Sequence, residues 1–223
     1  MSTIAKAINS SVGRKLVMSL TGLFLISFLL VHLSGNLQLF KSDGGLQFNA
    51  YAKFMVTNPI IRIMEIGLLL GFVLHIYQAI VLTRANNKAK GKENSKADAA
   101  SSTWYSRNMG LTGTVILVFL IIHLKNFYFQ YKFGEVGIDA GGNKDLYTIV
   151  ATMFAEEWWY SILYIISMVI LGFHLNHGFQ SAFRSFGLRN SKYSPIVNSV
   201  GTLYAIVVPA GYIAMPLYFW LFV

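Results

Sequence analysis

Four histidines occur one each in four successive hydrophobic segments of this 223-residue sequence: His32, His75, His123 and His174, with His177 one helical turn further on. An ionisable side chain at membrane depth is energetically costly, and such residues usually mark functional sites. Imidazole is a common metal ligand, and two imidazoles can hold a haem iron from opposite faces. The histidines therefore predict haem binding.

The segments that carry these histidines are apolar enough to cross a bilayer. Hydrophobic residues make up 55% of the sequence and charged residues 12%, about half the charged fraction of a soluble domain. Apolar runs of about 20 residues predict spanning helices. We expect an all-α integral membrane protein, a single transmembrane domain over residues 1–223. Its five helices should lie at about 16–40, 60–84, 104–131, 157–184 and 196–222.

Helix-start residues and a polar stretch between these segments support the predicted helix boundaries. Asn58-Pro59 and Ser194-Pro195 are typical helix starts. Residues 85–103 are polar and lysine-rich, and predict a solvated loop. The first apolar run lacks a cleavage site and predicts a retained helix. Cysteine is absent, which excludes disulfides, iron–sulfur ligation and covalent c-type haem.

Basic residues are distributed unevenly between the two sides of the predicted helices. The N-terminal segment and the segments 84–107 and 184–192 hold 12 of the 18 basic residues and two acids. The opposite side holds six basic residues and seven acids. The positive-inside rule then places the N-terminus in the cytoplasm and the C-terminus outside. The basic net charge reflects topology, and we expect no nucleic-acid partner.

Helix geometry converts this topology into depths, at about 1.5 Å per residue. His32 and His123 both lie about 24 Å from the cytoplasmic ends of their helices, and His75 and His174 lie about 13–15 Å from theirs. A b-type haem held by two histidines needs imidazoles at one depth on different helices. We therefore expect two haems, one between His75 and His174 and one between His32 and His123. The fifth helix carries no histidine, so it should pack outside a four-helix haem bundle.

Two alternatives accompany this interpretation. His177, nearer the polar boundary, could replace His174 as ligand, although His174 matches the depth of His75 better. Glycines near the histidines, such as Gly22, Gly71 and Gly113, could admit a porphyrin or simply allow close helix packing. A histidine can also serve only for interhelical hydrogen bonding, but four at two matched depths favour ligation.

Four stretches resemble the cytochrome b membrane anchor of succinate dehydrogenase/fumarate reductase, of the single-chain, five-helix, two-haem type. They are GLFLISFLLVHLSGNLQLF (22–40), NPIIRIMEIGLLLGFVLHIYQAIVLT (58–83), SRNMGLTGTVILVFLIIHLKNFYF (106–129) and FHLNHGFQSAFRSFG (173–187). The resemblance implies axial ligands at His32, His75, His123 and His174. The H-x-x-x-G pattern of the family's fourth helix matches His174 with Gly178.

The resemblance also implies a role in succinate:quinone oxidoreductase, respiratory complex II, in a prokaryotic cell membrane. Such an anchor binds two b haems, is surrounded by lipid, and docks a flavoprotein and an iron–sulfur subunit on its cytoplasmic face. It passes electrons between the iron–sulfur subunit and a quinone, commonly menaquinone in the two-haem family. The chain has no dicarboxylate chemistry of its own, so its share of the enzyme is electron transfer and quinone oxidoreduction.

Polar residues near the two predicted haems supply further candidates. Haem propionates on the cytoplasmic side could contact Arg14, Lys15, Arg107, His177 and Arg184, unless this charge only sets topology. A quinone near the outer haem could contact Asn36, Gln38, Arg62, Glu65, Lys125 and Asn126. The alternative is that Arg62 and Glu65 pair only with each other, since they are three residues apart on a helix. Some related anchors carry an acid two residues before the fourth-helix histidine, where this chain has Gly172.

Two other functions are compatible with the pattern. The chain could anchor another quinone-linked enzyme, such as a hydrogenase or formate dehydrogenase. It could also be a haem-free, proton-coupled transporter. No internal repeat is evident, however, and no pair of broken helices lies at mid-membrane, as many transporters require.

Overall fold

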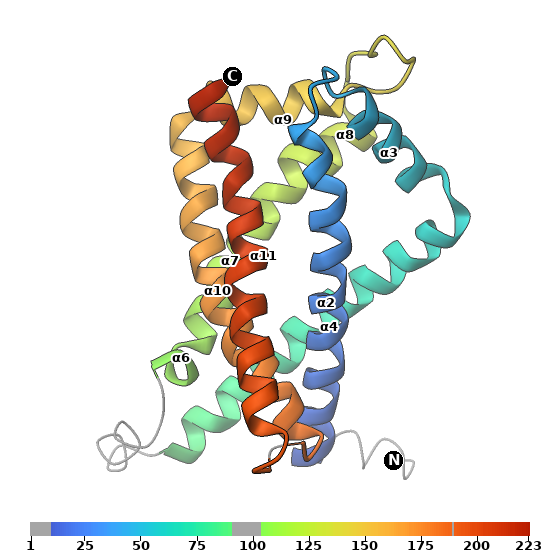
Figure 1. Ribbon diagram of the computed structural model, residues 1–223. Helices are drawn as coiled ribbons and strands as arrows, with labels where there is room; N and C mark the ends of the chain where they lie inside the picture. Colours follow the sequence, from blue (N-terminus) through green and yellow to red (C-terminus); the bar gives the residue numbers. More distant parts are fainter. Residues whose placement is uncertain (1–9, 91–103, 189) are drawn as a thin grey trace. The chain divides into compact units, whose positions relative to one another are not determined.

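The computed structural model describes residues 10–90, 104–188 and 190–223. Within these ranges, five helical spans are long and apolar enough to cross a membrane. The fold class is thus the predicted one, all-α with five membrane-length spans. The helices are labelled in Figure 1 and are α2 (Ser11–Asn36), continued by the short 3-10 helix η1 (Leu37–Phe40), α4 (Pro59–Lys90), α7 (Met109–His123), α10 (Trp158–Ser185) and α11 (Ser194–Phe222).

The start of α4 follows its predicted signal, but its end does not. The side-chain oxygen of Asn58 accepts hydrogen bonds from the backbone N–H groups of Ile60 and Ile61, 3.0 and 3.3 Å away. Such a cap is worth about 1 kcal/mol. The helix continues to Lys90, so residues 85–90, predicted as loop, are helical. Propagating an established helix costs little for residues such as Ala and Lys. The rest of the predicted loop, 91–103, lies outside the described residues.

The third predicted span is divided into several segments. α6 (Trp104–Arg107) precedes α7, which is followed by the π-helical segment η2 (Leu124–Phe129) and by α8 (Gln130–Phe133). A π-helical turn widens the helix and often occurs at functional sites. Here it begins directly after His123 and includes two of the predicted quinone-site residues.

Two shorter helices between the spans were not predicted. They are α3 (Leu46–Thr57) and α9 (Leu146–Ala155), which pack against each other. The fully buried amide of Asn49 on α3 donates hydrogen bonds to carboxylates of Asp139 and Asp145, at 3.1 and 3.0 Å. Asp145 also caps α9. Buried polar groups are rarely left unpaired, and this junction satisfies them.

The described residues fall into two compact units, and each spanning helix contributes a segment to both. Unit 1 comprises Met1–Ser27, Gly67–Gly113 and Phe173–Ala205 as far as these are described; unit 2 comprises Phe28–Ile66, Thr114–Gly172 and Ile206–Val223. The single domain over residues 1–223 stays a prediction.

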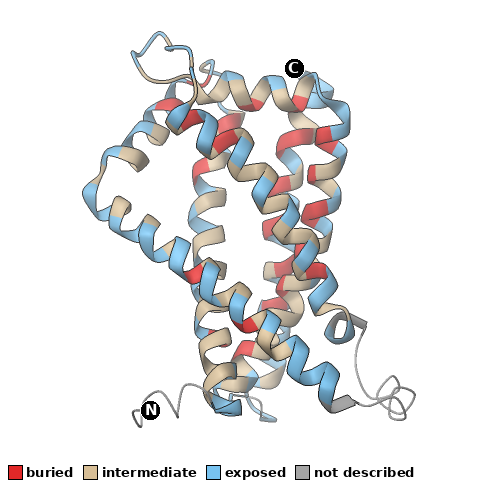
Figure 2. Cartoon of the chain, turned by 180° about the vertical axis from the view of Figure 1, so that it is seen from behind, coloured by how far each residue is buried: buried red, intermediate tan, exposed pale blue. Residues whose placement is uncertain are grey.

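In unit 2, buried side chains form one stripe on α10 and another on α11. Their spacing of three and four residues is that of one helix face. Figure 2 shows buried positions recurring along both helices. The stripes consist of Tyr160, Tyr164, Met168 and Leu171 on α10, and of Val208, Tyr212, Met215 and Phe219 on α11.

Helix α11 is bonded to α2 within each unit. In unit 1 the Tyr204 hydroxyl donates to the carbonyl of Ile26, at 2.6 Å. In unit 2 the Tyr212 hydroxyl donates to the carbonyl of Leu29, at 2.8 Å. A four-helix haem bundle with the fifth helix outside it stays a prediction.

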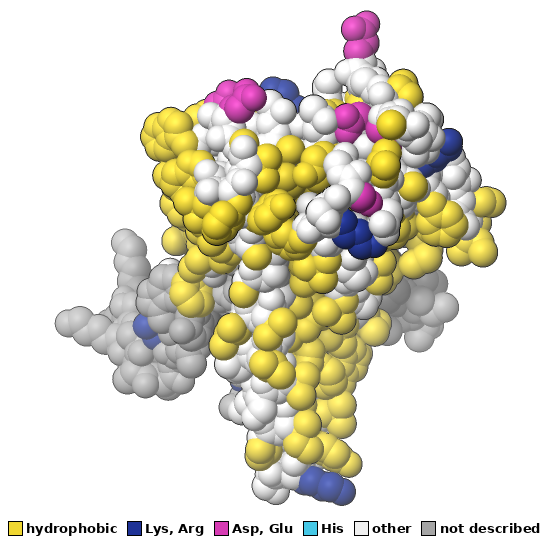
Figure 3. Space-filling view, turned by 45° about the horizontal axis from the view of Figure 1, so that its top comes forward, with side chains coloured by type: hydrophobic (Ala, Val, Ile, Leu, Met, Phe, Trp, Pro, Cys, Tyr) yellow, Lys and Arg dark blue, Asp and Glu magenta, His cyan; other side chains and the backbone are white. Residues whose placement is uncertain are grey.

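Charge divides between the units as the sequence indicates. All seven acidic residues among the described ranges belong to unit 2, and unit 1 has only basic residues there. In Figure 3, acidic side chains are visible at the end tilted towards the reader, and hydrophobic side chains cover much of the surface shown. An apolar helix surface is what lipid contact requires.

Candidate functional site

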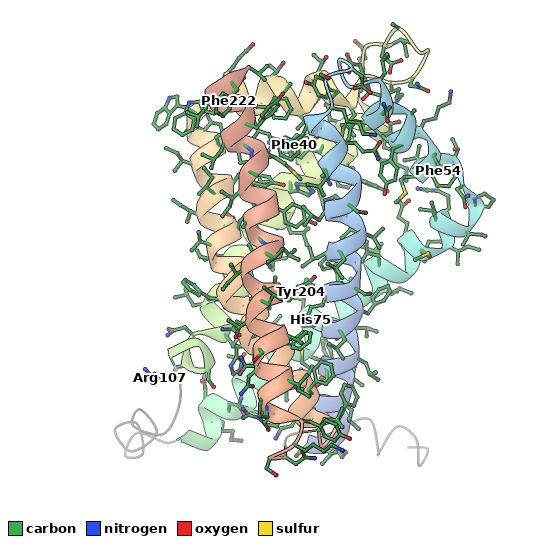
Figure 4. The ribbon with its side chains drawn as sticks, in the orientation of Figure 1. Phe40, Phe54, His75, Arg107, Tyr204 and Phe222 are labelled. Atoms are coloured by element: carbon green, nitrogen blue, oxygen red, sulfur yellow. The ribbon has the colours of Figure 1, made fainter. Side chains whose placement is uncertain are left out.

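Unit 1 contains the first histidine pair. The ring centroids of His75 on α4 and His174 on α10 lie 6.4 Å apart, with an angle of 64° between the ring planes. An imidazole nitrogen lies about 2 Å from a bound metal, so two imidazoles on one metal have ring centres roughly 6 Å apart. The spacing is therefore that of two ligands of one iron. His75 is labelled in Figure 4.

Two threonine hydroxyls contact these rings. Thr21 Oγ1 on α2 lies 3.3 Å from His75 Nδ1, and Thr112 Oγ1 on α7 lies 3.2 Å from His174 Nδ1. Interhelical hydrogen bonding of histidine, the alternative to metal ligation, is thus present in this unit. It uses only Nδ1 of each ring, however, and leaves Nε2 for another partner.

The glycine after each threonine lies against the same ring. A Cβ built on Gly22 would be 3.4 Å from His75 Cε1, and one on Gly113 would be 3.6 Å from His174 Cε1. Gly71 instead faces Phe24 of α2, where a Cβ would be 3.0 Å from the ring. Gly22 and Gly113 therefore lie against the histidine rings, and Gly71 lies at a helix-packing contact.

Unit 2 contains the second pair, His32 on α2 and His123 on α7. Their ring centroids lie 5.8 Å apart and their planes are nearly perpendicular, at 87°. Phe28 stacks on His32 at 5.2 Å, and Phe119 stacks on His123 at 5.6 Å. Each phenylalanine is four residues before its histidine, so the stacking follows from the helical repeat.

Further aromatic rings complete the surroundings of this second pair. Phe127 and Tyr164 lie 5.3 and 6.2 Å from His123, and Tyr212 of α11 lies 5.9 Å from His32. His123 Nδ1 is buried and makes no hydrogen bond to the described residues. Unit 2 thus orients its histidines mainly by packing.

The donor sets fit a haem better than a bare metal ion. Among the described residues, no group of three or more His, Cys, Asp or Glu side chains could hold a metal. A bare ion usually takes four or more protein ligands, whereas haem iron takes its equatorial ligands from the porphyrin and needs only two axial ones. Two imidazoles at the spacing of one shared metal match that need in each unit.

The predicted propionate contacts all belong to unit 1, the unit of His75 and His174. They are Arg14 and Lys15 in α2, Arg107 at the end of α6 (labelled in Figure 4), and His177 and Arg184 in α10. His177 is within electrostatic reach of His174 and Arg184, but the ring paired with His75 is that of His174. A Cβ built on Gly178 would meet no atom of the described residues within 4 Å.

The predicted quinone-site residues separate into several places within unit 2. Lys125 and Asn126 line a hollow of about 400 Å³. Glu157 and Trp159 also line it, and the Trp159 indole N–H donates to the Glu157 carboxylate at 2.6 Å. The full lining is Ile122, Lys125, Asn126, Met153, Glu157 and Trp159.

Arg62 and Glu65 form an ion pair with each other, the alternative that their spacing suggests. Glu65 is also bonded to Tyr128 and Lys132. The Asn36 amide donates to the His32 carbonyl, at 2.7 Å. Gln38 lies in η1, where its carbonyl accepts from the backbone of Lys41. These four residues do not line the hollow.

A short repeat in the sequence escaped the sequence analysis. Helices α2 and α7 share the pattern Thr-Gly-x5-Phe-x3-His, over residues 21–32 and 112–123. The Thr-Gly part contacts the histidine pair of unit 1, and the Phe-His part belongs to the pair of unit 2. The pattern is too short to stand out as a repeat without the contacts.

Comparisons with models of known protein families, with curated proteins and with solved structures find no match for this chain. The resemblance to the succinate dehydrogenase anchor therefore rests on the motifs quoted above. The histidine geometry is a separate argument, because it follows from ring positions alone.

Proposed function

We propose that the chain is the two-haem cytochrome b anchor of a succinate:quinone oxidoreductase, respiratory complex II. His75 with His174, and His32 with His123, would each bind one b-type haem. The observation that supports this most strongly is the spacing of the two ring pairs, 6.4 and 5.8 Å between centroids. Both values are close to the distance between imidazoles that share one metal.

Haem iron, when bound, supplies one-electron oxidation and reduction. The side chains of the chain itself would do the remaining work. The four imidazoles would hold the iron, and Thr21 and Thr112 contact Nδ1 of two of them. Phe28, Phe119 and their aromatic neighbours exclude water from the other pair. Exclusion of solvent is one of the levers that set a haem potential.

The charge division supports the proposed topology and partners. The described part of unit 1 has basic residues and no acidic ones. This charge favours a position at the cytoplasmic side of a prokaryotic cell membrane. The N-terminus would then be cytoplasmic and the C-terminus outside. The flavoprotein and iron–sulfur subunits would dock on the cytoplasmic face. There the anchor would exchange electrons with the subunits that oxidise succinate or reduce fumarate.

The hollow lined by Lys125 and Asn126 is the best-supported quinone site. Lys125 and Asn126 offer N–H donors to a quinone oxygen, and Trp159 offers an aromatic wall. The Glu157 carboxylate also lines the hollow and accepts a hydrogen bond from the Trp159 indole N–H. The resemblance favours menaquinone as the substrate.

Purification of the complex from native membranes tests this function. We expect the chain to copurify with a flavoprotein and an iron–sulfur protein and to support succinate:quinone electron transfer. Copurification with hydrogenase or formate dehydrogenase subunits would assign the anchor to another enzyme. A haem-free chain that moves protons with a solute would instead support the transporter.

A further inference from the structure

We propose that Thr21 and Thr112 are positioning residues that keep the proton of His75 and His174 on Nδ1. The Nε2 lone pair of each ring would then be directed at iron. This inference rests on the proposed haem ligation. It concerns unit 1 alone and assigns the two hydroxyls a redox role beyond helix packing.

The argument starts from the single proton of a threonine hydroxyl. Thr21 Oγ1 lies 2.9 Å from the carbonyl oxygen of Val17 and 3.1 Å from that of Met18. Thr112 Oγ1 lies 3.1 Å from the carbonyl oxygen of Met109. A carbonyl can only accept, so the hydroxyl proton points to the helix backbone. The hydroxyl oxygen then has only lone pairs to offer a histidine.

The bond to each histidine therefore has one direction. At 3.3 and 3.2 Å, Nδ1–H of His75 and of His174 donates to the threonine oxygen. A neutral imidazole carries one proton, and with that proton on Nδ1 the lone pair is on Nε2. That is the form in which histidine binds a metal. A hydrogen bond donated by the second nitrogen also makes the ligand more basic.

The adjacent glycines lie against the edges of the same two rings. The ring carbon Cε1, between the two nitrogens, lies against Gly22 in His75 and against Gly113 in His174. Each Thr-Gly dipeptide thus provides a hydroxyl for Nδ1 and room for the ring edge. That this dipeptide occurs twice, on α2 and on α7, argues against a chance packing contact.

Unit 2 supplies an internal comparison, because its histidine rings stack on phenylalanine rings. His32 Nδ1 lies 3.4 Å from the Asn36 amide nitrogen, and His123 Nδ1 makes no hydrogen bond. A change at Thr21 or Thr112 should therefore act on one haem only.

Potentiometric titration of the purified complex, with low-spin EPR spectra, tests the inference in Thr21→Val. We expect both haems to be retained. The potential of the His75/His174 haem should rise, because the ligand becomes less basic. At a fixed applied potential, the ratio of reduced to oxidised haem should increase severalfold. Its EPR g-values should shift as the ring rotates. Thr21→Ser should restore both properties, and the other haem should not change.

Ser27→Ala is the matched control, since Ser27 is on the same helix and its hydroxyl donates only to the Phe24 carbonyl. An unchanged potential and unchanged g-values in Thr21→Val, or an equal shift in Ser27→Ala, would overturn the inference and leave the haem ligation standing. If Thr21→Val does not assemble, Thr112→Val with Thr112→Ser decides by the same criteria. A wild-type protein without haem would instead overturn the proposed function.

Discussion

The two histidine pairs are held by different kinds of contact. In unit 1, hydroxyls and glycines surround His75 and His174. In unit 2, stacked and edge-on aromatic rings surround His32 and His123. The ring separations nevertheless differ by less than 1 Å, 6.4 against 5.8 Å.

This difference shows that one ligand geometry can be reached by hydrogen bonding or by packing. A hydrogen bond specifies which nitrogen carries the proton, whereas stacking specifies only the plane of the ring. The two proposed haems should therefore respond to different substitutions. The predictions below separate them, beginning with the largest effect.

Removal of one histidine from each pair should delete one haem and spare the other. We expect His75→Ala to remove the unit 1 haem and His123→Ala the unit 2 haem, since each pair would lose one of its two proposed axial ligands. Reduced-minus-oxidised spectra and EPR of the purified protein measure the loss.

Loss of the same centre in both variants would show that the pairing is wrong. His177→Ala provides the control for the choice of ligand on α10. It should perturb the unit 1 haem without deleting it. If it deletes that haem while His174→Ala retains it, His177 is the ligand.

Removal of a stacked ring should weaken the unit 2 haem only. Phe119→Ala deletes the ring that lies 5.6 Å from the His123 ring. Phe119 is half-buried, so the truncation should cost less than the roughly 3–5 kcal/mol of a fully buried Phe. We expect partial loss of haem from unit 2, measured by pyridine haemochrome content, and Phe119→Leu should retain more. Equal loss from unit 1 would break the distinction between the pairs.

Addition of one methyl group should affect unit 1 more mildly. The Cβ of Gly22→Ala would meet His75 Cε1 at 3.4 Å, so the ring must yield slightly. We expect a small shift of the unit 1 haem spectrum at full occupancy. Gly178→Ala, which meets no neighbour within 4 Å, is the control. A shift in the control as large as in Gly22→Ala would contradict the proposed contact.

Acid should loosen unit 2 before unit 1, through the α3–α9 junction. The backbone N–H of Asn143 and the Asn49 amide help to hold the pKa of Asp139 below its usual value. A lowered folded-state pKa stabilises the fold above the unfolded value, about 4, and the contribution is lost as pH falls through the folded pKa. We expect thermal unfolding followed by the unit 2 haem signal to be steady from pH 7 to 5 and to weaken below about pH 4.

Asn49→Ala should remove part of this acid sensitivity, because the backbone N–H of Asn143 still bonds to Asp139. It also leaves the Tyr147 backbone N–H without its acceptor, and the loss of an ordinary hydrogen bond costs about 0.5–1.5 kcal/mol. The junction reaches the histidine pair through Phe154, whose ring lies 5.0 Å from Tyr164 beside His123. An acid response of the unit 1 haem equal to that of unit 2 would exclude this route.

The sequence was sufficient for features that depend on one helix at a time. Apolar runs and the Asn58-Pro59 cap predicted the five spans, and counting residues along helices placed His32 level with His123. It was insufficient where several segments cooperate. The bonds of Asn49 join residues about 90 positions apart, and α9 is too short to stand out as a span.

The contacts of each histidine were likewise beyond sequence reasoning. Thr21 lies on the same helix as His32, yet its hydroxyl contacts His75. The hollow brings Glu157 together with Lys125 and Asn126, which lie in the π-helical segment of another span. Local patterns identify the chemical groups, and tertiary packing decides which of them meet.

Haem stoichiometry tests the central claim most directly. The purified wild-type chain, within its complex, should show a reduced-minus-oxidised spectrum of about two low-spin b haems per chain, each removed by substitution of its own pair. A haem-free preparation, or one haem that survives substitution of either pair, would contradict the account.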